Sequence, residues 1–267
     1  MKWHWKLLIG LGLLTVLAVI LNVGLNIWIQ HQLPKIINKK NDSAYFITYK
    51  KLRISLWHSN MNAEEIVIIP KAGIKDSINK AGIYGTVKSI EVRDFKVWSF
   101  LFSDRLKAKS ITVEKPEAVL YKRNEKTTIR ESVVAPFEKI ITVSDVFINH
   151  GDFKIMDVKS NKTVLSLQNI GFNLDGIVVT DAILKEKIPF KFNSYTLSCD
   201  SLYYRPDEFY HIQVKKIKSA KNALALSGFE MVPEYSRHEF VAKINKEKDL
   251  YTLFCDSIKT KESGLGL

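Results

Sequence analysis

The two cysteines are the residues of this chain best suited to metal or redox chemistry, and they lie in two similar eight-residue phrases that share six residues. Cys199 is part of YTLSCDSL, and Cys255 is part of YTLFCDSI. A thiolate metal site needs further ligands, and no histidine stands at ligand spacing from either cysteine. A disulfide between them stays open if their strands are neighbours. The sequence favours one structural unit used twice over a reactive centre.

A strand would place alternate side chains of this repeat on opposite faces of a sheet. Both cysteines would then lie in an apolar row, where a free Cys behaves as a small hydrophobe. The first copy is expected to place Tyr195, Leu197, Cys199 and Ser201 on one face, and the second copy to place Tyr251, Leu253, Cys255 and Ser257 on the equivalent face.

The other residues that could do chemistry form no known catalytic pattern. The chain has no GxSxG, P-loop, HExxH or GxGxxG motif, and its six histidines are dispersed. His150, in the phrase NHGD, is typical of a turn before Gly151. We expect no catalytic residue, no metal site and no cofactor, so the protein is predicted not to be an enzyme. A site assembled from residues distant in sequence is the alternative that motifs do not test.

The elements that position these residues are mainly β-strands. After Pro34 the hydrophobic period becomes two, with β-branched and aromatic runs separated by Gly, Asn, Asp or Pro. A weak helical signal lies at 98–104, and strands do not alternate regularly with helices, so we expect a long antiparallel sheet that curls or closes incompletely. Strands are predicted within 54–70, 87–98, 108–121, 141–158, 164–179, the two repeat copies and 210–217.

An uncharged segment near the amino terminus predicts a membrane anchor. Leu7–Ile29 is free of charge and would span roughly 34 Å as a helix, against a hydrocarbon core of ~30 Å. Trp5 and Trp28 flank it as interfacial residues do, and Leu7 and Leu21 belong to its apolar body. A cleaved signal peptide is the alternative, but no small-x-small site follows the segment. Lysines on both sides leave the orientation undecided by charge.

The net charge of +12 and the pI near 9.5 would suit an acidic partner. The 40 Lys and Arg residues are scattered, however, and most alternate with apolar residues, as in HIQVKKIKSAK at 211–221. That pattern is typical of the solvated face of a sheet, so we expect no nucleic-acid partner.

Several phrases resemble the amino-terminal part of AsmA-like proteins of bacterial envelopes. That family begins with an uncleaved helix and a short basic linker, followed by a segment of the form L-x-I-S-L and an apolar run ending in Pro. The matching phrases here are LRISLWHSNMNAEEIVIIP (52–70), VKSIEVRDFKVW (87–98), ITVEKPEAVLY (111–121) and, as a strand, an Asn-x-Gly turn and a return strand, VSDVFINHGDFKIMD (143–157).

The resemblance implies a domain organisation and a location. It implies a long, curled, repeat-like sheet with an apolar concave face, as in chorein-type bridge proteins, projecting from the bacterial inner membrane into the periplasm on a single-pass anchor. Residues 1–6 would be a cytoplasmic amino terminus, 7–29 the transmembrane helix, 30–43 a linker and 44–267 the β-rich periplasmic domain. Family members usually run longer, so this domain is expected to be incomplete at its carboxyl end.

The resemblance also implies a function. Such proteins are thought to guide phospholipid between membranes or to influence outer-membrane assembly. The expected partners are phospholipid, the inner membrane and outer-membrane or envelope-assembly proteins. The alternative function is a non-enzymatic scaffold for outer-membrane protein assembly. The residues expected to line a lipid groove are Tyr195, Leu197, Cys199, Tyr251, Leu253 and Cys255.

Overall fold

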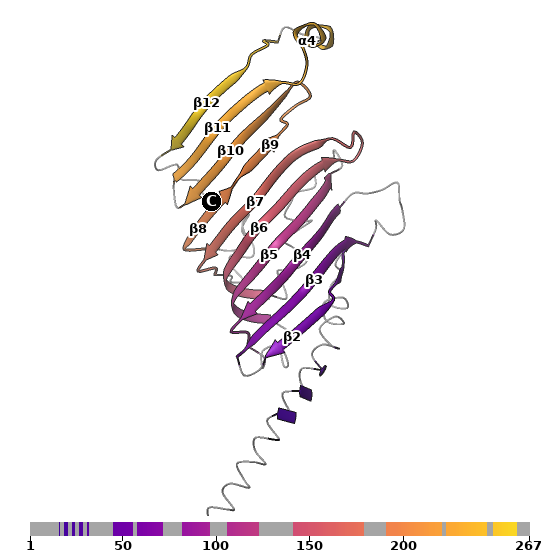
Figure 1. Cartoon of the computed structure of the whole chain (residues 1–267), viewed down its shortest axis with the longest axis vertical. Coiled ribbons are helices and arrows are strands. Elements are labelled where there is room, and N and C mark those ends of the chain that lie inside the picture. The colour runs from indigo at the N-terminus through magenta and orange to yellow at the C-terminus, as the bar shows by residue number, and fades with distance from the viewer. Residues whose placement is uncertain are drawn as a thin grey trace, which may run out of the picture.

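A single 12-stranded sheet forms the body of the protein, and its strands stack along the long axis of the molecule from β2 to β12 (Figure 1). The structure is a computed structural model of the 267-residue chain. It describes residues 16, 19–20, 23–24, 27–28, 31, 45–55, 58–71, 82–96, 106–122, 141–178, 191–220, 223–244 and 248–260. The expectation of a mainly β protein with one large curled sheet is therefore confirmed.

The strands follow the chain in order. Their bounds are β1 (Tyr45–Thr48), β2 (Lys51–Ser55), β3 (Asn60–Pro70), β4 (Gly82–Arg93), β5 (Leu106–Lys122), β6 (Ile141–Asp157), β7 (Thr163–Asp175), β8 (Ser194–Cys199), β9 (Ser201–Tyr204), β10 (Tyr210–Ala220), β11 (Ala223–Pro233) and β12 (Leu253–Thr260). A short helix, α4 (Arg237–Lys243), lies between β11 and β12.

Neighbours in the sheet are mostly neighbours in the sequence. The order is β1-β3-β4-β5-β6-β7-β8-β10-β11-β12, with β2 also paired to β3 and with β9 between β7 and β10. One pair departs from the expected antiparallel arrangement, because β5 and β6 are parallel over their length, from Leu106↔Ile141 to Lys122↔Asp157. Parallel neighbours need a crossover connection, which a repeating strand pattern does not reveal. Residues 123–140, which connect the two, lie outside the described residues.

The prediction of a turn at Asn149–Gly151 is wrong. β6 passes through this phrase as one strand of 17 residues and stays paired to β5 on both sides of it. His150 has a φ of 55°, so the backbone takes a left-handed residue inside the strand without reversing direction. The strand predicted within 87–98 ends earlier than that range, since β4 ends at Arg93 and Asp94 has a φ of 51°.

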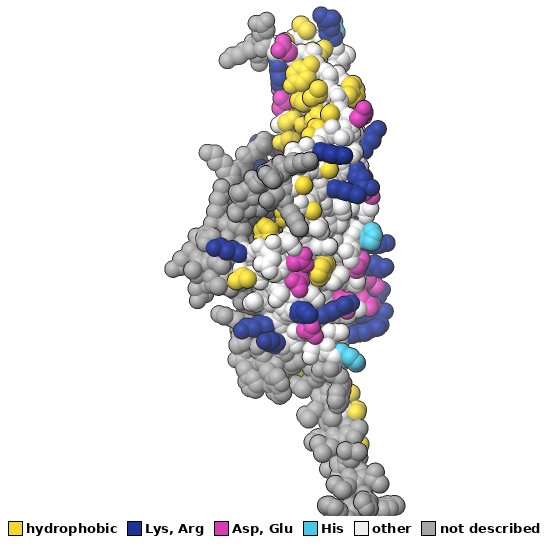
Figure 2. All heavy atoms as spheres, turned by 90° about the vertical axis from the view of Figure 1, so that its left-hand side faces the viewer, with side chains coloured by type: hydrophobic (Ala, Val, Ile, Leu, Met, Phe, Trp, Pro, Cys, Tyr) yellow, Lys and Arg dark blue, Asp and Glu magenta, His cyan; other side chains and the backbone are white. Residues whose placement is uncertain are grey.

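The sheet has one apolar and one polar face. We define the apolar face by the sheet residues that are almost fully buried, and cross-strand pairs such as Ile54↔Met61 and Cys199↔Ile217 place them on one side. Seen from the side, Lys and Arg line one edge of the profile, and hydrophobic side chains gather over its upper part (Figure 2). The buried hydrophobic sheet residues are Tyr45, Leu52, Ile54, Ile66, Val87, Val92, Leu120, Leu174, Cys199, Tyr210, Val214 and Ile217.

Helix α4 closes one end of the apolar face and was not predicted. The Ser236 hydroxyl caps the helix by accepting from the Glu239 backbone N–H. The Glu239 carboxylate in turn accepts from the Ser236 backbone N–H, which completes a capping box. Phe240 is 1% exposed and its ring lies 5.9 Å from that of Tyr210. A helix this short carries little periodicity, so its signal in the sequence is the capping box.

The predicted membrane helix falls mostly outside the described residues. Of residues 7–29 the structure describes the helical positions Val16, Val19, Ile20, Val23, Gly24, Ile27 and Trp28. Within the described residues, no helix is long and apolar enough to cross a membrane. Trp5, Leu7 and Leu21, the 30–43 linker apart from His31, and the helical signal at 98–104 also lie outside the described residues.

Candidate functional site

The apolar face depends on a break in the strand alternation that recurs across the whole sheet. In each of these strands two consecutive polar or small residues lie on the polar face, and the residues on either side of them lie on the apolar face. We call each such pair a polar step. The polar steps are Lys50–Lys51, Glu64–Glu65, Lys88–Ser89, Glu114–Lys115, Asn149–His150, Gln168–Asn169, Asp200–Ser201, Lys215–Lys216, Ser227–Gly228 and Asp256–Ser257.

The polar steps are aligned from strand to strand. Glu64 pairs with Ser89, Ser89 with Glu114, and Glu114 with Asn149, so one row crosses four strands. The row shifts only between β6 and β7, where the pairing is irregular around Gly151. A single bulge bends one strand. Aligned steps instead shift the alternation of side chains between the two faces by one residue in every strand that has a step. The apolar residues therefore stay on one face on both sides of the row.

Backbone geometry marks several of these steps. Glu65, Lys115, His150 and Asn169 have φ between 47° and 55°, which is uncommon for residues with a Cβ. Gly228 has a φ of 61°, and a Cβ there would approach Lys215 Cδ to 2.8 Å. Side-chain contacts support the row on the polar face: Lys50 Nζ lies 3.0 Å from Glu65 Oε1, and the Asn169 amide donates to Asp200.

The repeated cysteine phrase is one instance of this step. Cys199 and Leu202 belong to the same buried cluster, with Asp200 and Ser201 between them on the polar face. The thiol of Cys199 donates to the Ser201 carbonyl oxygen at 3.0 Å. The expectation that Ser201 follows Cys199 on one face is therefore wrong, because the step shifts the alternation by one residue. Ser257 is on the polar face for the same reason.

The two copies are not neighbours in the sheet. β8 pairs with β10, β10 with β11, and β11 with β12, so two strands separate Cys199 from Cys255. Three strand spacings of about 4.8 Å amount to roughly 14 Å, twice the Cα separation that a disulfide allows. Both cysteines are free thiols.

The residues expected to line a lipid groove lie on or beside the apolar face, with unequal exposure. Cys199 is 2% exposed, whereas Leu253 is 50% exposed and its partner across the strands is Met231. Leu197 and Tyr195 are half-buried, and the Tyr195 hydroxyl lies 3.0 Å from the hydroxyl of Ser219. Burial therefore decreases from β8 toward β12, where Cys255 is half-buried.

Tyr251 lies just before β12, and its ring stacks on that of Tyr210 at 5.0 Å. The backbone N–H of Tyr251 donates to the Tyr210 hydroxyl, which itself donates to the Asp249 carbonyl oxygen. This tyrosine pair fixes the start of β12 near the start of β10. Tyr251 thus has a structural contact that the repeat pattern did not predict.

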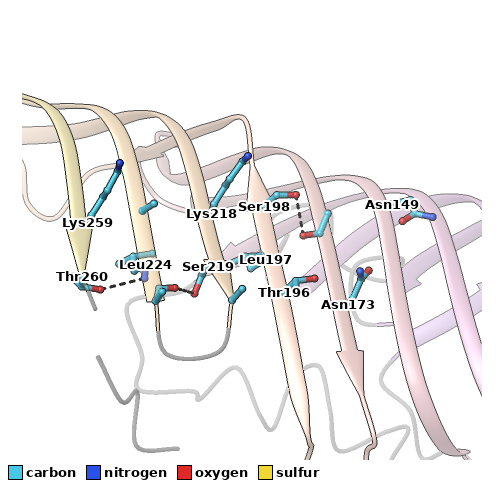
Figure 3. Close-up of a pocket in the computed structure, with 14 residues that line it drawn as sticks. Asn149, Asn173, Thr196, Leu197, Ser198, Lys218, Ser219, Leu224, Lys259 and Thr260 are labelled. Atoms are coloured by element: carbon cyan, nitrogen blue, oxygen red, sulfur yellow. Dashed lines mark hydrogen bonds between the residues drawn. The ribbon is translucent and has the colours of Figure 1, made fainter. Parts of the chain in front are cut away.

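A hollow of about 640 Å³ lies on the polar face between β6 and β12 (Figure 3). Lys218 and Lys259 extend to the same side at its rim, and Asn149 and Asn173 lie at its other end. Small side chains form its floor, and the Ser198 hydroxyl donates to the Gly171 carbonyl oxygen at 3.5 Å. The hollow is lined by Asn149, Gly171, Asn173, Thr196, Leu197, Ser198, Lys218, Ser219, Ala220, Ala223, Leu224, Ala225, Lys259 and Thr260.

A small titratable cluster lies near the end of β9, the start of β10 and the end of β11. Glu234 accepts from the Tyr203 hydroxyl at 3.2 Å and lies 3.0 Å from His211 Nδ1. Burial and the nearby Glu234 carboxylate raise the pKa of Tyr203, so its phenol stays protonated and donates. Among the described residues, no group of three or more His, Cys, Asp or Glu side chains could hold a metal ion.

The polar steps were not predicted from the sequence, although the sequence carries a signal for them. Each is a polar or small doublet between apolar residues in a strand, as in A-EE-I at 63–66, V-KK-I at 214–217 and C-DS-L at 199–202. A doublet in one strand resembles a strand end, so only the comparison of all strands reveals a row.

The chain was also compared with known proteins. No protein-family model matches it, and no curated protein matches it.

Proposed function

We propose that the protein binds phospholipid along the apolar face of its sheet, and that it does so as a membrane-anchored protein of the bacterial envelope. The observation that carries the proposal is the continuous apolar face, which the aligned polar steps keep on one side of all the strands. The resemblance to AsmA-like proteins points the same way. The anchor over 7–29, a periplasmic sheet and a role in outer-membrane lipid homeostasis are parts of this proposal.

The physical basis is the transfer of acyl chains out of water. Each buried CH₂ contributes about 0.8 kcal/mol, so an apolar surface several strands wide can hold a lipid tail without any reactive group. The region best placed to receive a tail lies over β11 and β12, where Met231, Cys255 and Leu253 share the face and burial is least complete. Polar headgroups would remain in solvent.

Adjacent residues of β12 provide a matched test of the face. Leu253 is on the apolar face and 50% exposed, whereas Phe254 is 65% exposed and pairs with Glu230 on the polar face. Replacing Leu253→Glu should sharply reduce the phospholipid that co-purifies with the full chain, because a carboxylate in contact with a tail must be desolvated. Phe254→Glu adds the same charge to the same strand and should leave retained lipid unchanged. Native mass spectrometry and lipid extraction of both variants measure the difference.

A second pair extends the test to β8. Leu197→Glu should also reduce bound lipid, with Ser198→Glu, on the polar face, as its control. Circular dichroism and thermal unfolding show whether each variant keeps its fold. Equal lipid loss in both members of a pair, or in neither, would contradict lipid binding by the apolar face.

The alternative is a scaffold for outer-membrane protein assembly. Among the described residues no strand pairs with the outer side of β12, and this favours the scaffold because an unpaired strand edge can accept another polypeptide. A stably folded wild-type chain that retains no lipid would support the scaffold.

A further inference from the structure

The hollow on the polar face is lined by a continuous row of residues that lie directly opposite one another. Gly171 pairs with Ser198, and Ser198 pairs with Lys218. Lys218 in turn pairs with Ala225, and Ala225 pairs with Lys259. The row therefore runs from β7 to β12 and carries one lysine on β10 and another on β12, and all of its residues line the hollow.

The two lysines are placed to act on one anion. Lys218 and Lys259 lie two strand spacings apart, roughly 10 Å between their Cα atoms, and both side chains extend to the same side of the sheet (Figure 3). Ala225 stands between them with only a methyl group, so the space between the two side chains belongs to the hollow. Two ammonium groups in this arrangement can donate to different oxygens of one phosphate.

Neither ammonium group is paired with a carboxylate. The ion pairs among the described residues involve other cations, as where Lys215 Nζ lies 4.0 Å from Glu230 Oε1, and none of them includes Lys218 or Lys259. An anion bound between the two lysines would interact favourably with both charges. The β12 end of the hollow is therefore suited to a negatively charged group.

The other end of the hollow presents neutral hydrogen-bonding groups. Asn173 on β7 lies directly opposite Thr196 on β8, and both line the hollow. Within the part of the chain that the structure describes, neither side chain has a hydrogen-bond partner, whereas the nearby Asn149 amide donates to Glu114. An amide and a hydroxyl can each donate and accept, which suits the hydroxyl groups of a ligand.

We propose that the hollow binds an organic phosphate whose carbon skeleton carries hydroxyl groups, that is, a sugar phosphate or the polyol phosphate headgroup of a lipid. The phosphate would lie over Ala225 and accept from Lys218 and Lys259, and the hydroxyl groups would reach Asn173 and Thr196. Ala225 and Thr196 are roughly 12 Å apart, because two strand spacings and two residues along a strand separate them. This inference concerns the polar face and does not depend on lipid binding by the apolar face.

Isothermal titration calorimetry of the full chain with glucose 6-phosphate tests the proposal. Glucose 6-phosphate should bind more tightly than inorganic phosphate, and glucose should not bind detectably. Lys218→Gln and Lys259→Gln should each weaken the binding of glucose 6-phosphate roughly tenfold, because each removes a charge-assisted hydrogen bond. The matched control is Lys216→Gln, which removes an exposed lysine from the same strand and face as Lys218 but outside the hollow. Its affinity should be nearly that of the wild type.

A second pair of variants tests the hydroxyl end. Thr196→Val removes the hydroxyl and keeps the shape of the side chain, so it should reduce the preference for glucose 6-phosphate over inorganic phosphate and leave the affinity for inorganic phosphate unchanged. Ser198→Ala is the control, because the Ser198 hydroxyl already donates to the Gly171 carbonyl oxygen. Circular dichroism and thermal unfolding of every variant show that these exposed substitutions keep the fold.

The source of the ligand is decided by a second probe, glycerophosphoglycerol, which is the deacylated headgroup of phosphatidylglycerol. Tighter binding of this probe than of glucose 6-phosphate would assign the hollow to a lipid headgroup, and the reverse order would assign it to a soluble sugar phosphate. Equal loss of affinity in Lys216→Gln and Lys218→Gln would mean attraction by general positive charge and would overturn the proposal. Equal affinity of the wild type for glucose 6-phosphate and inorganic phosphate, or no binding of either organic phosphate, would overturn it as well.

Discussion

Cys199 and Cys255 have the same backbone relationship to the serine two residues later. The thiol of Cys199 donates to the Ser201 carbonyl oxygen at 3.0 Å, and the thiol of Cys255 donates to that of Ser257 at 3.5 Å. A regular strand would place residue i+2 on the same face as the cysteine. Both serines instead lie on the polar face, so the repeated phrase specifies a local geometry and not only a hydrophobic pattern.

The two thiols should differ in reactivity. Cys199 is 2% exposed and is also bonded to the Gln168 carbonyl oxygen, whereas Cys255 is half-buried near the open edge. Since thiol–disulfide exchange requires access, DTNB should modify Cys255 in the folded protein and Cys199 only after unfolding. The Cys255→Ser variant should then show no fast reaction. Mild oxidation should produce no intramolecular disulfide, and modification of both thiols at the same rate would contradict the buried position of Cys199.

The polar steps predict opposite effects for two lysine-to-glycine substitutions. Lys115 has a φ of 47°, a conformation that costs a residue with a Cβ roughly 1–2 kcal/mol and costs glycine almost nothing. Lys115→Gly should therefore raise the free energy of unfolding by up to about 1 kcal/mol. Lys154 is exposed on neighbouring β6 with ordinary strand backbone, so Lys154→Gly should lower the free energy of unfolding by about 0.5–1 kcal/mol.

Urea titrations of both lysine variants give the two values. A loss of stability in both would mean that the left-handed residue in β5 carries no strain that glycine can relieve.

The fold class and several strands could be predicted from the sequence, because β-branched residues alternate clearly with polar ones there. The range 108–121 closely matches β5, and 164–179 covers most of β7. β11 was not predicted, since ALALSGFEMVP contains one β-branched residue and a glycine. Its strand conformation comes from pairing with β10 and β12, which no local pattern encodes.

The polar steps show more clearly where local patterns are insufficient. Asn149–His150 was interpreted as a turn, because a phase change within one strand has the same appearance as the end of that strand. Its actual role depends on Glu114 in β5, whose carboxylate accepts from the Asn149 amide. The parallel pairing of β5 and β6 could not be predicted from local patterns either, because the direction of a strand is set by its connection and not by its own residues.

The capping box of α4 should contribute measurably to stability. Ser236→Ala removes the hydroxyl that accepts from the Glu239 backbone N–H, and the loss of such a cap typically costs about 1 kcal/mol. Glu239→Gln keeps a side-chain acceptor for the Ser236 backbone N–H and should cost less. Arg237→Ala, inside the same helix but outside the box, serves as the comparison. Equal destabilisation by all three substitutions would indicate that the helix end is not fixed by this box.

Asp207 should make the stability of the β10–β12 corner depend on pH. Its carboxylate accepts from the backbone N–H groups of Phe209 and Tyr210 at 2.8 and 2.9 Å, and from Lys248 Nζ at 2.9 Å. Lys248 also lies 4.0 Å from the ring centroid of Phe209. Burial alone would raise the pKa of Asp207, but these donors outweigh it and lower the pKa below the ordinary value of 3.8.

A lowered pKa in the folded state means that the carboxylate stabilises the fold above the unfolded pKa, and that this contribution disappears as the pH falls through the folded pKa. Asp207→Asn should therefore cost about 1 kcal/mol of unfolding free energy at pH 7, allowing for solvent screening of a partly exposed group. The cost should shrink toward zero as the pH falls below the lowered folded-state pKa. Neighbouring Glu208→Gln is the control and should show a small effect at both values. Chemical denaturation at pH 7 and in acid measures the difference, and a cost for Asp207→Asn that is the same at both pH values would rule out stabilisation by the ionised carboxylate.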